Sequence, residues 1–212
     1  IRDTVRVLGL DTFGADLELV IGDEVYPTYE RPPLVLDATY VGDGSSQPVI
    51  VIANHLRSMD GIDSDDGIVR ALRHEQALRL SELIQQLQLT RPEVPLVVTG
   101  NFNAYQFSDG WVDVMGQLTG DLDPLGALLP GTDVVDPDLV NHVLSLAAAE
   151  RYSFVAAGNA EARDTMLSSR AAARAVSAVA YARGNADAPR ALLLDDGTPV
   201  SFSDHDGVVL YL

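Results

Sequence analysis

Two short apolar segments flank a long stretch of helical periodicity, and this arrangement constrains the fold more than any other feature of the chain. Residues 49–53 and 96–99 are β-branched runs, typical of strands that are buried on both faces. Between them, apolar residues recur at helical spacing from Ile68 to Leu87, and the pattern ends before Pro92. A strand, a helix and a second strand form a crossover unit, which predicts two neighbouring parallel strands of an α/β sheet.

A polar cluster follows each of these two strands. Asn54 and His55 follow the first strand, and Asn101 and Asn103 follow the second. The carboxyl ends of neighbouring parallel strands meet at one edge of a sheet, where α/β proteins build their sites. The sequence therefore predicts that these side chains lie close together.

The C-terminal half of the chain predicts further strands. Residues 152–155 and 164–167 are typical of a hairpin around a turn at 158–159. Residues 175–181 fit a strand, although their alanines also fit a helix, and residues 208–211 form the last expected strand.

Polar residues also interrupt this half of the chain. Asp164 lies in an otherwise apolar strand, and Asp204 and His205 directly precede the last one. A buried polar group without a partner costs roughly 1–3 kcal/mol, so packing alone does not explain these residues or the two clusters above. We therefore expect all of them to form one shared polar site.

The segment after Asn103 predicts a short helix from Ser108, as its N-cap, to Gly120. Tyr105, Phe107 and Trp111 stand near its start, and aromatic residues there favour core packing over a base-stacking edge. Several other features have plain structural interpretations. The acidic loop 60–67 fits no calcium-loop frame, Arg73, Glu75 and Arg79 fit a solvated helix face, and His74 and His142 have no partner at ligand spacing.

Composition narrows the class of protein. The 212 residues are 47% hydrophobic and 21% charged, which is typical of one globular domain, and no apolar run reaches the ~20 residues of a membrane span. The net charge is −17, and all 14 basic residues are arginine, so a protein that coats DNA nonspecifically is not expected. With no cysteine, any metal must be held by carboxylate, amide or imidazole groups.

The ordered clusters resemble the signatures of the endonuclease/exonuclease/phosphatase superfamily, which has the deoxyribonuclease-I-like fold. The signatures are residues 54–58, 100–104 and 203–206, and residues 29–34, 105–110, 151–154 and 185–187 are similar to secreted bacterial extracellular nucleases. The resemblance implies an α/β fold, a two-sheet β-sandwich flanked by helices on both outer faces in four layers. It covers residues 31–212 of a single domain.

The family's first strands carry an asparagine and a metal-binding glutamate, and nothing in residues 1–30 replaces them convincingly. We therefore expect a domain, residues 1–212, that is truncated at its N-terminus. The resemblance also implies an extracellular or cell-surface location.

The resemblance further implies phosphodiester hydrolysis assisted by a divalent metal, Mg²⁺ or Mn²⁺. Asp164 would orient the ring of His205, and Asp204 would help to hold the metal. Asn103 would donate to a phosphate oxygen, and His55 would bind or protonate near the leaving group.

The resemblance implies that Arg31 would contact a flanking phosphate.

Asn101 is the main departure from the family. The family has aspartate at this position, where the carboxylate is expected to orient or deprotonate the attacking water. An amide cannot accept a proton at neutral pH, so a general-base contribution of roughly 10²–10⁴-fold is at risk. Thr165 is a second departure, because relatives often have histidine there. Both an active and a weakened homologue remain open.

The preferred function is a metal-dependent phosphodiesterase, a secreted nuclease-like enzyme whose partner is nucleic acid or another phosphodiester. A phosphatase of phospholipids or sugar phosphates on the same fold is one alternative, because specificity lies in loops. A noncatalytic binding module is the other. No membrane span and no obligate protein partner are expected.

Overall fold

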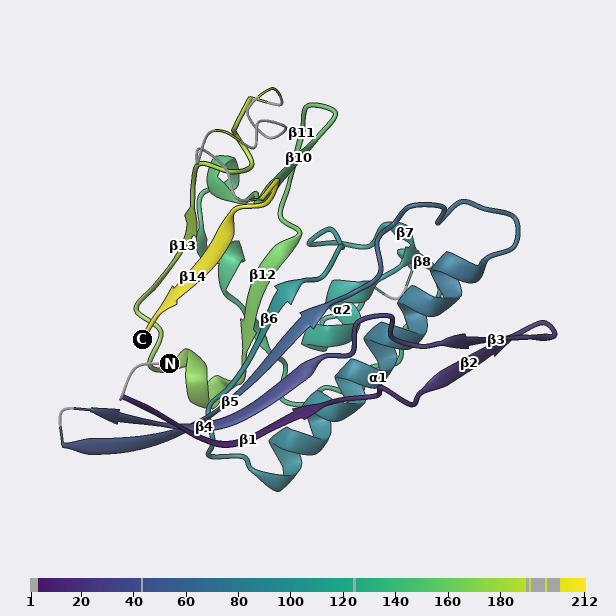
Figure 1. Ribbon diagram of the computed structural model, residues 1–212. Coiled ribbons are helices and arrows are strands. Elements are labelled where there is room, and N and C mark those ends of the chain that lie inside the picture. The colour runs from purple at the N-terminus through teal and green to yellow at the C-terminus, as the bar shows by residue number, and fades with distance from the viewer. Residues whose placement is uncertain (1–3, 43, 124, 190, 192–196, 198–202) are drawn as a thin grey trace.

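Six strands pair into the large sheet of the molecule (Figure 1). The computed structural model describes residues 4–42, 44–123, 125–189, 191, 197 and 203–212. The strands of the large sheet are, in spatial order, β1 (Val5–Thr12), β4 (Leu34–Gly42), β5 (Ser45–His55), β6 (Leu96–Asn101), β12 (Asp164–Ser168) and β9 (Val140–Asn141). Strands β5 and β6 are parallel, and the other neighbours in this sheet are antiparallel.

Helices cover one face of this sheet. Helix α1 (Ile68–Thr90) follows β5 and returns the chain to β6, as the crossover pattern predicts. Helix α2 (Val114–Thr119) lies beside α1 (Figure 1). The main hydrophobic core joins both helices to the sheet through Ile50, Ile52, Ala77, Leu80, Ile84, Leu96, Val98, Val114, Met115, Leu118 and Leu167. The apolar periodicity of α1 is thus satisfied by burial against β5 and β6.

The remaining strands form four two-stranded sheets. They are β2 (Glu18–Ile21) with β3 (Glu24–Pro27), β7 (Gly110–Val112) with β8 (Ala127–Leu129), β10 (Phe154–Ala156) with β11 (Asn159–Glu161), and β13 (Ala178–Ala182) with β14 (Gly207–Tyr211). Strands β13 and β14 lie beside β12 in Figure 1 and form a smaller core with the 3₁₀ helix η1 (His142–Ser145). Two short helical turns complete the described elements, η2 (Ala148–Glu150) and α3 (Arg170–Ala173).

The structure confirms the predicted α/β fold and the strand, helix and strand unit, but it corrects two local predictions. Residues 164–167 do not pair with 152–155; the hairpin around Gly158 joins β10 to β11, while β12 pairs with β6. The short helix begins at Val114 rather than near Ser108. Its N-cap is Asp113, whose side chain accepts a hydrogen bond from the Gly116 N–H at 2.9 Å, and the preceding residues form β7.

Residues 5–27 form three strands that the sequence pattern did not predict. Strand β1 pairs with β4 at the edge of the large sheet, with a register shift between Val7 and Gly9. Six of the eight residues of β1 are exposed and none is fully buried, so no buried apolar face marks this segment in the sequence. Within the described ranges, no helix combines the length and the apolar character that crossing a membrane requires.

Candidate functional site

Register pairing places three of the predicted site residues side by side at one edge of the large sheet. His55 at the end of β5 is paired with Asn101 at the end of β6, and Asn101 is paired with Asp164 at the start of β12. Paired residues on adjacent strands point to the same face and stand about 5 Å apart. The three side chains therefore form a row across three strands.

Gly100 allows β5 and β6 to approach closely where this row begins. Its φ is 130°, and a Cβ atom there would lie 1.9 Å from the backbone oxygen of Asn54. Any other residue at this position would push β6 away from β5. The glycine of the second signature thus sets the spacing between His55 and Asn101.

A hydrogen-bonded pair extends the row to the C-terminal segment. Asp164 Oδ2 accepts a hydrogen bond from His205 Nδ1 at 2.5 Å and another from Ser153 Oγ at 2.7 Å. A carboxylate only accepts, so His205 carries a proton on Nδ1 and its Nε2 is free of this pair. The ring is also held between neighbours, because Phe154 stacks on it with ring centroids 4.5 Å apart.

The loop that carries His205 is fixed by the segment at 183–187. Asp206 accepts backbone hydrogen bonds from Asn185 and Ala186 and forms an ion pair with Arg183 at 3.1 Å. Asn185 Nδ2 donates to the backbone oxygen of His205 at 2.8 Å. These contacts fix the backbone of the loop at His205, and Asp164 and Phe154 hold its ring.

The two histidines of the row have opposite charge preferences. The hydrogen bond to Asp164 raises the pKa of His205 above its ordinary value, although burial acts in the opposite direction. Burial lowers the pKa of His55, and the positive charge of Arg31 lowers it further. At any given pH a larger fraction of His205 than of His55 is therefore protonated. Two neighbouring groups whose pKa values are shifted in opposite directions often serve as the acid and the base of a reaction.

We predict that this split is measurable by NMR titration of the ring protons of the four histidines, assigned with single His→Gln variants. His205 should titrate above 6.5, the ordinary value, and His55 below it. Asp164→Asn should lower the pKa of His205, because the largest cause of its rise is removed. A pKa of His205 at or below 6.5 in the unchanged protein would contradict the hydrogen-bonded pair of Asp164 and His205.

Arg31 contacts His55 directly. Its Nη1 lies 2.8 Å from Nδ1 and 2.9 Å from Nε2 of the ring. A guanidinium only donates hydrogen bonds, so this contact requires a ring nitrogen that accepts, and thus a neutral imidazole. Both residues line a pocket of about 270 Å³ that also includes Arg57, Ser58 and Asn103.

Asn103, just after the end of β6, is held tightly by hydrogen bonds. It adopts φ 47°, and its backbone N–H donates to Asn101 Oδ1 at 2.8 Å. Its Nδ2 donates to the backbone oxygen of Leu56 at 2.8 Å, which leaves one amide hydrogen for another acceptor. Arg73 Nη1 donates to the Asn103 backbone oxygen at 2.8 Å and thereby joins the loop to helix α1.

The prediction that Arg73 lies on a solvated helix face is wrong, because only 1% of this residue is exposed. Its guanidinium donates to the backbone oxygen of Arg57 at 2.6 Å and forms an ion pair with Asp109 at 3.2 Å. One sequence signal could have found it. Position 73 lies on the same helix face as Val69 and Ala77, which are both buried.

Asp204 is exposed beside His205, and its negative charge raises the pKa of that ring. No group of three or more histidine, aspartate or glutamate side chains that could hold a metal is found in the described part of the chain. The carboxylate of Asp164 is already occupied by His205 and Ser153. Asp60, in the wall of the pocket beside His55, is a second carboxylate without an ion pair among the described residues. These scattered carboxylates form no group of three ligands and do not by themselves fit a divalent-metal site.

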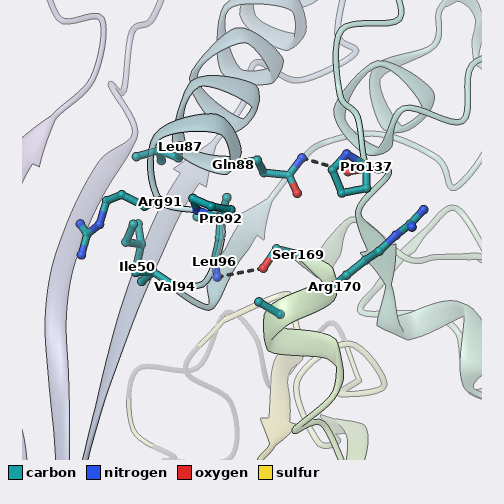
Figure 2. A pocket seen from close by; sticks show the side chains of 11 residues that line it. Ile50, Leu87, Gln88, Arg91, Pro92, Val94, Leu96, Pro137, Ser169 and Arg170 are labelled. Carbon is teal, nitrogen blue, oxygen red and sulfur yellow. Dashed lines mark hydrogen bonds between the residues drawn. The ribbon is translucent and has the colours of Figure 1, made fainter.

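Another pocket lies at the opposite end of the same strands (Figure 2). Leu96, which begins β6, lines it, whereas Asn101 ends that strand roughly 17 Å away by strand geometry. Its polar groups bond to one another: Ser169 Oγ accepts from the Leu96 N–H, and Gln88 donates to the Pro137 oxygen. Nothing in this arrangement points to chemistry.

Comparisons with known proteins support the fold. No protein-family model matches the chain, and no curated protein matches it in sequence. Solved structures do match. Truncated TDP2 from Caenorhabditis elegans aligns with a TM-score of 0.57 and 12% identity over 97% of this chain and 66% of that one.

Two further structures are similar. An endonuclease/exonuclease/phosphatase protein from Bacteroides vulgatus aligns with a TM-score of 0.55 and 16% identity, over 99% of this chain and 66% of that one. The 3′ phosphatase NExo from Neisseria, bound to a product DNA hairpin, aligns with a TM-score of 0.57 and 17% identity, over 97% and 71%. The chain therefore shares the deoxyribonuclease-I-like fold of these structures, and it spans about two thirds of their length.

Proposed function

We propose that the protein is a phosphodiester hydrolase that acts on nucleic acid with the help of a divalent metal, and that it works outside the cell. The observation that carries the proposal is the row of His55, Asn101 and Asp164, extended by His205. Four polar groups from four segments meet at one sheet edge, and a mainly structural role would not require two histidines of opposite charge preference. The extracellular location rests on the resemblance to secreted nucleases.

The proposed roles follow from the hydrogen-bond chemistry of each group. Protonated His205, oriented by Asp164, would donate from Nε2 to an oxygen of the scissile phosphate and balance the charge that develops there. Asn103 would donate its remaining amide hydrogen to the same phosphate. Neutral His55 would bind near the leaving group, and Arg31 would contact a flanking phosphate.

Nucleic acid is the proposed substrate on the basis of local charge. The chain as a whole carries −17, but Arg31 and Arg57 line the pocket beside His55. Arg57 is paired with Glu30, whereas Arg31 has no carboxylate partner among the described residues. The likeness to NExo, which was solved with product DNA, supports the same substrate class.

The test is hydrolysis by the purified protein of single-stranded DNA, duplex DNA and a chromogenic phosphodiester. Each substrate is incubated with Mg²⁺, with Mn²⁺ and with EDTA. Cleavage that requires the metal is expected. If a folded sample hydrolyses none of the substrates under any condition, the proposal is rejected and a noncatalytic binding module takes its place.

Metal binding gives a separate prediction. Because the described residues hold no group of three potential ligands, the 212-residue chain should bind Mg²⁺ with a Kd on the order of millimolar or weaker, since Mg²⁺ commonly needs substrate phosphates to complete its ligand set. Calorimetric titration measures this, and Asp204→Asn should abolish the residual heat. Tight binding by the unchanged chain would mean that the metal ligands are placed wrongly.

A further inference from the structure

Two aromatic rings stand beside the proposed site with no packing role that explains them. Phe107 is 70% exposed, which contradicts the core position expected for it, whereas Trp111 packs against the main core as predicted. Tyr105 and Phe107 stack with ring centroids 5.4 Å apart and 16° between their planes. Because Tyr105 covers one face of the Phe107 ring, its exposure leaves the other face open.

Gln106 anchors the loop that carries these rings to the rest of the fold. Gln106, between them, points inward and donates to the backbone oxygen of Ala162 at 2.8 Å. Its Oε1 accepts from Asn141 Nδ2 at 2.6 Å. The inward Gln106 directs its two neighbours outward, so the aromatic pair is held in place before any ligand arrives.

The aromatic pair borders a hollow whose lining segments lead directly into the proposed site. Tyr105, Phe107, Ala162 and Arg151 line it, together with Glu161, whose charge is paired with Arg163 at 2.6 Å. Tyr105 is two residues from Asn103, and Ala162 is two residues from Asp164. Two residues span at most about 7 Å, so the hollow opens next to the groups proposed to hold the scissile phosphate.

We propose that the Tyr105–Phe107 pair stacks an unpaired nucleobase of the substrate, next to the scissile phosphate, and that the enzyme therefore prefers single-stranded nucleic acid. This inference rests on the proposed function and names its substrate class. A flat base continues a parallel ring stack, and stacking is possible only for a base that is not inside a duplex. Arg151 supplies a positive charge for the backbone that carries the base.

The test compares Phe107→Ala with a matched control, Leu89→Ala. Leu89 lies on helix α1 and is 71% exposed, so its truncation removes similar surface far from the hollow. Both variants should fold, because neither side chain is buried. Binding is measured by fluorescence anisotropy of a labelled DNA single strand in EDTA, and of a strand of equal length in which every base is replaced by an abasic residue.

Phe107→Ala should weaken binding of the natural strand about tenfold, the loss typical of one base on an aromatic ring, and should leave binding of the abasic strand unchanged. Phe107→Trp should retain binding, and Leu89→Ala should behave as the unchanged protein. Equal loss on both strands, no loss on the natural strand, or no detectable binding by the unchanged protein would overturn the proposal.

Hydrolysis assays distinguish a failure of this inference from a failure of the proposed function on which it rests. With Mg²⁺, Phe107→Ala should raise KM for the single strand about tenfold and leave kcat unchanged, while duplex DNA is cleaved more slowly by every variant. If binding depends on Phe107 but no hydrolysis is detected, the stacking role of the Tyr105–Phe107 pair is supported and the proposed hydrolase activity is rejected. If hydrolysis occurs and its rate does not depend on Phe107, the proposed hydrolase activity is supported and the stacking role is rejected.

Discussion

Replacing His205 with alanine is expected to lower phosphodiester hydrolysis by about 10²–10⁴-fold, mainly in kcat. The ring is the one imidazole of the row that favours the protonated form, since its hydrogen bond to Asp164 raises its pKa. Its removal takes away the charged donor proposed for the scissile phosphate. The measurement is steady-state cleavage of a single-stranded oligonucleotide with Mg²⁺.

The matched control for this substitution is His74→Ala, which removes a histidine from helix α1. His74 contacts the Pro130 backbone oxygen at 3.1 Å and lies outside the row, so its loss should leave kcat unchanged. Asp164→Asn should cost nearly as much as His205→Ala, because an amide can present a donor to Nδ1 and stabilise the wrong tautomer.

The two changes should not be additive, since Asp164 acts through the ring that His205→Ala removes. If the His205 variant keeps full kcat while remaining folded, the pair is structural and the proposed chemistry is wrong.

Much of this site could be predicted from the sequence because it depends on periodicity. Strands β5 and β6 are apolar runs, helix α1 has a regular apolar spacing, and polar residues end both strands. Once the two strands are known to be parallel neighbours, His55 and Asn101 must lie at the same edge. The structure also places Asp164 and His205 beside them, where the signatures implied a shared site.

What could not be predicted depends on contacts between distant segments. The pairing of β12 with β6 rather than with residues 152–155 is decided by the sheet as a whole, because one strand pattern fits several partners. The sequence pattern indicates a surface position for Arg73, because its partners Asn103 and Asp109 are 30 or more residues away along the chain. Phe107 reads as a core residue, and its exposure follows from the inward direction of Gln106.

Asn101→Asp is expected to raise kcat, by as much as about 10²-fold, because a carboxylate at this position can orient and deprotonate the attacking water. The structure predicts that the substitution is tolerated. Asn101 Oδ1 accepts a hydrogen bond from the Asn103 N–H, and a carboxylate oxygen can accept the same bond. The change in volume is negligible, so the loop that holds Asn103 should keep its geometry.

The introduced charge can also be followed without an activity assay. Position 101 is paired with His55 across β5 and β6, so a carboxylate there should raise the pKa of His55 above its value in the unchanged protein. NMR titration of that ring gives the readout. Gln86→Glu, on the exposed side of helix α1, adds the same charge away from the site and should leave His55 unchanged.

Kinetics with and without the substitution then decide what Asn101 does. A gain in kcat with little change in KM, together with the His55 shift, would identify position 101 as the place of the general base and the natural asparagine as the cause of a weakened enzyme. A natural protein that is already fast and gains nothing from Asn101→Asp would require another proton acceptor. The neutral ring of His55, which stands next to Asn101 in the row, would then be the nearest group able to take the proton.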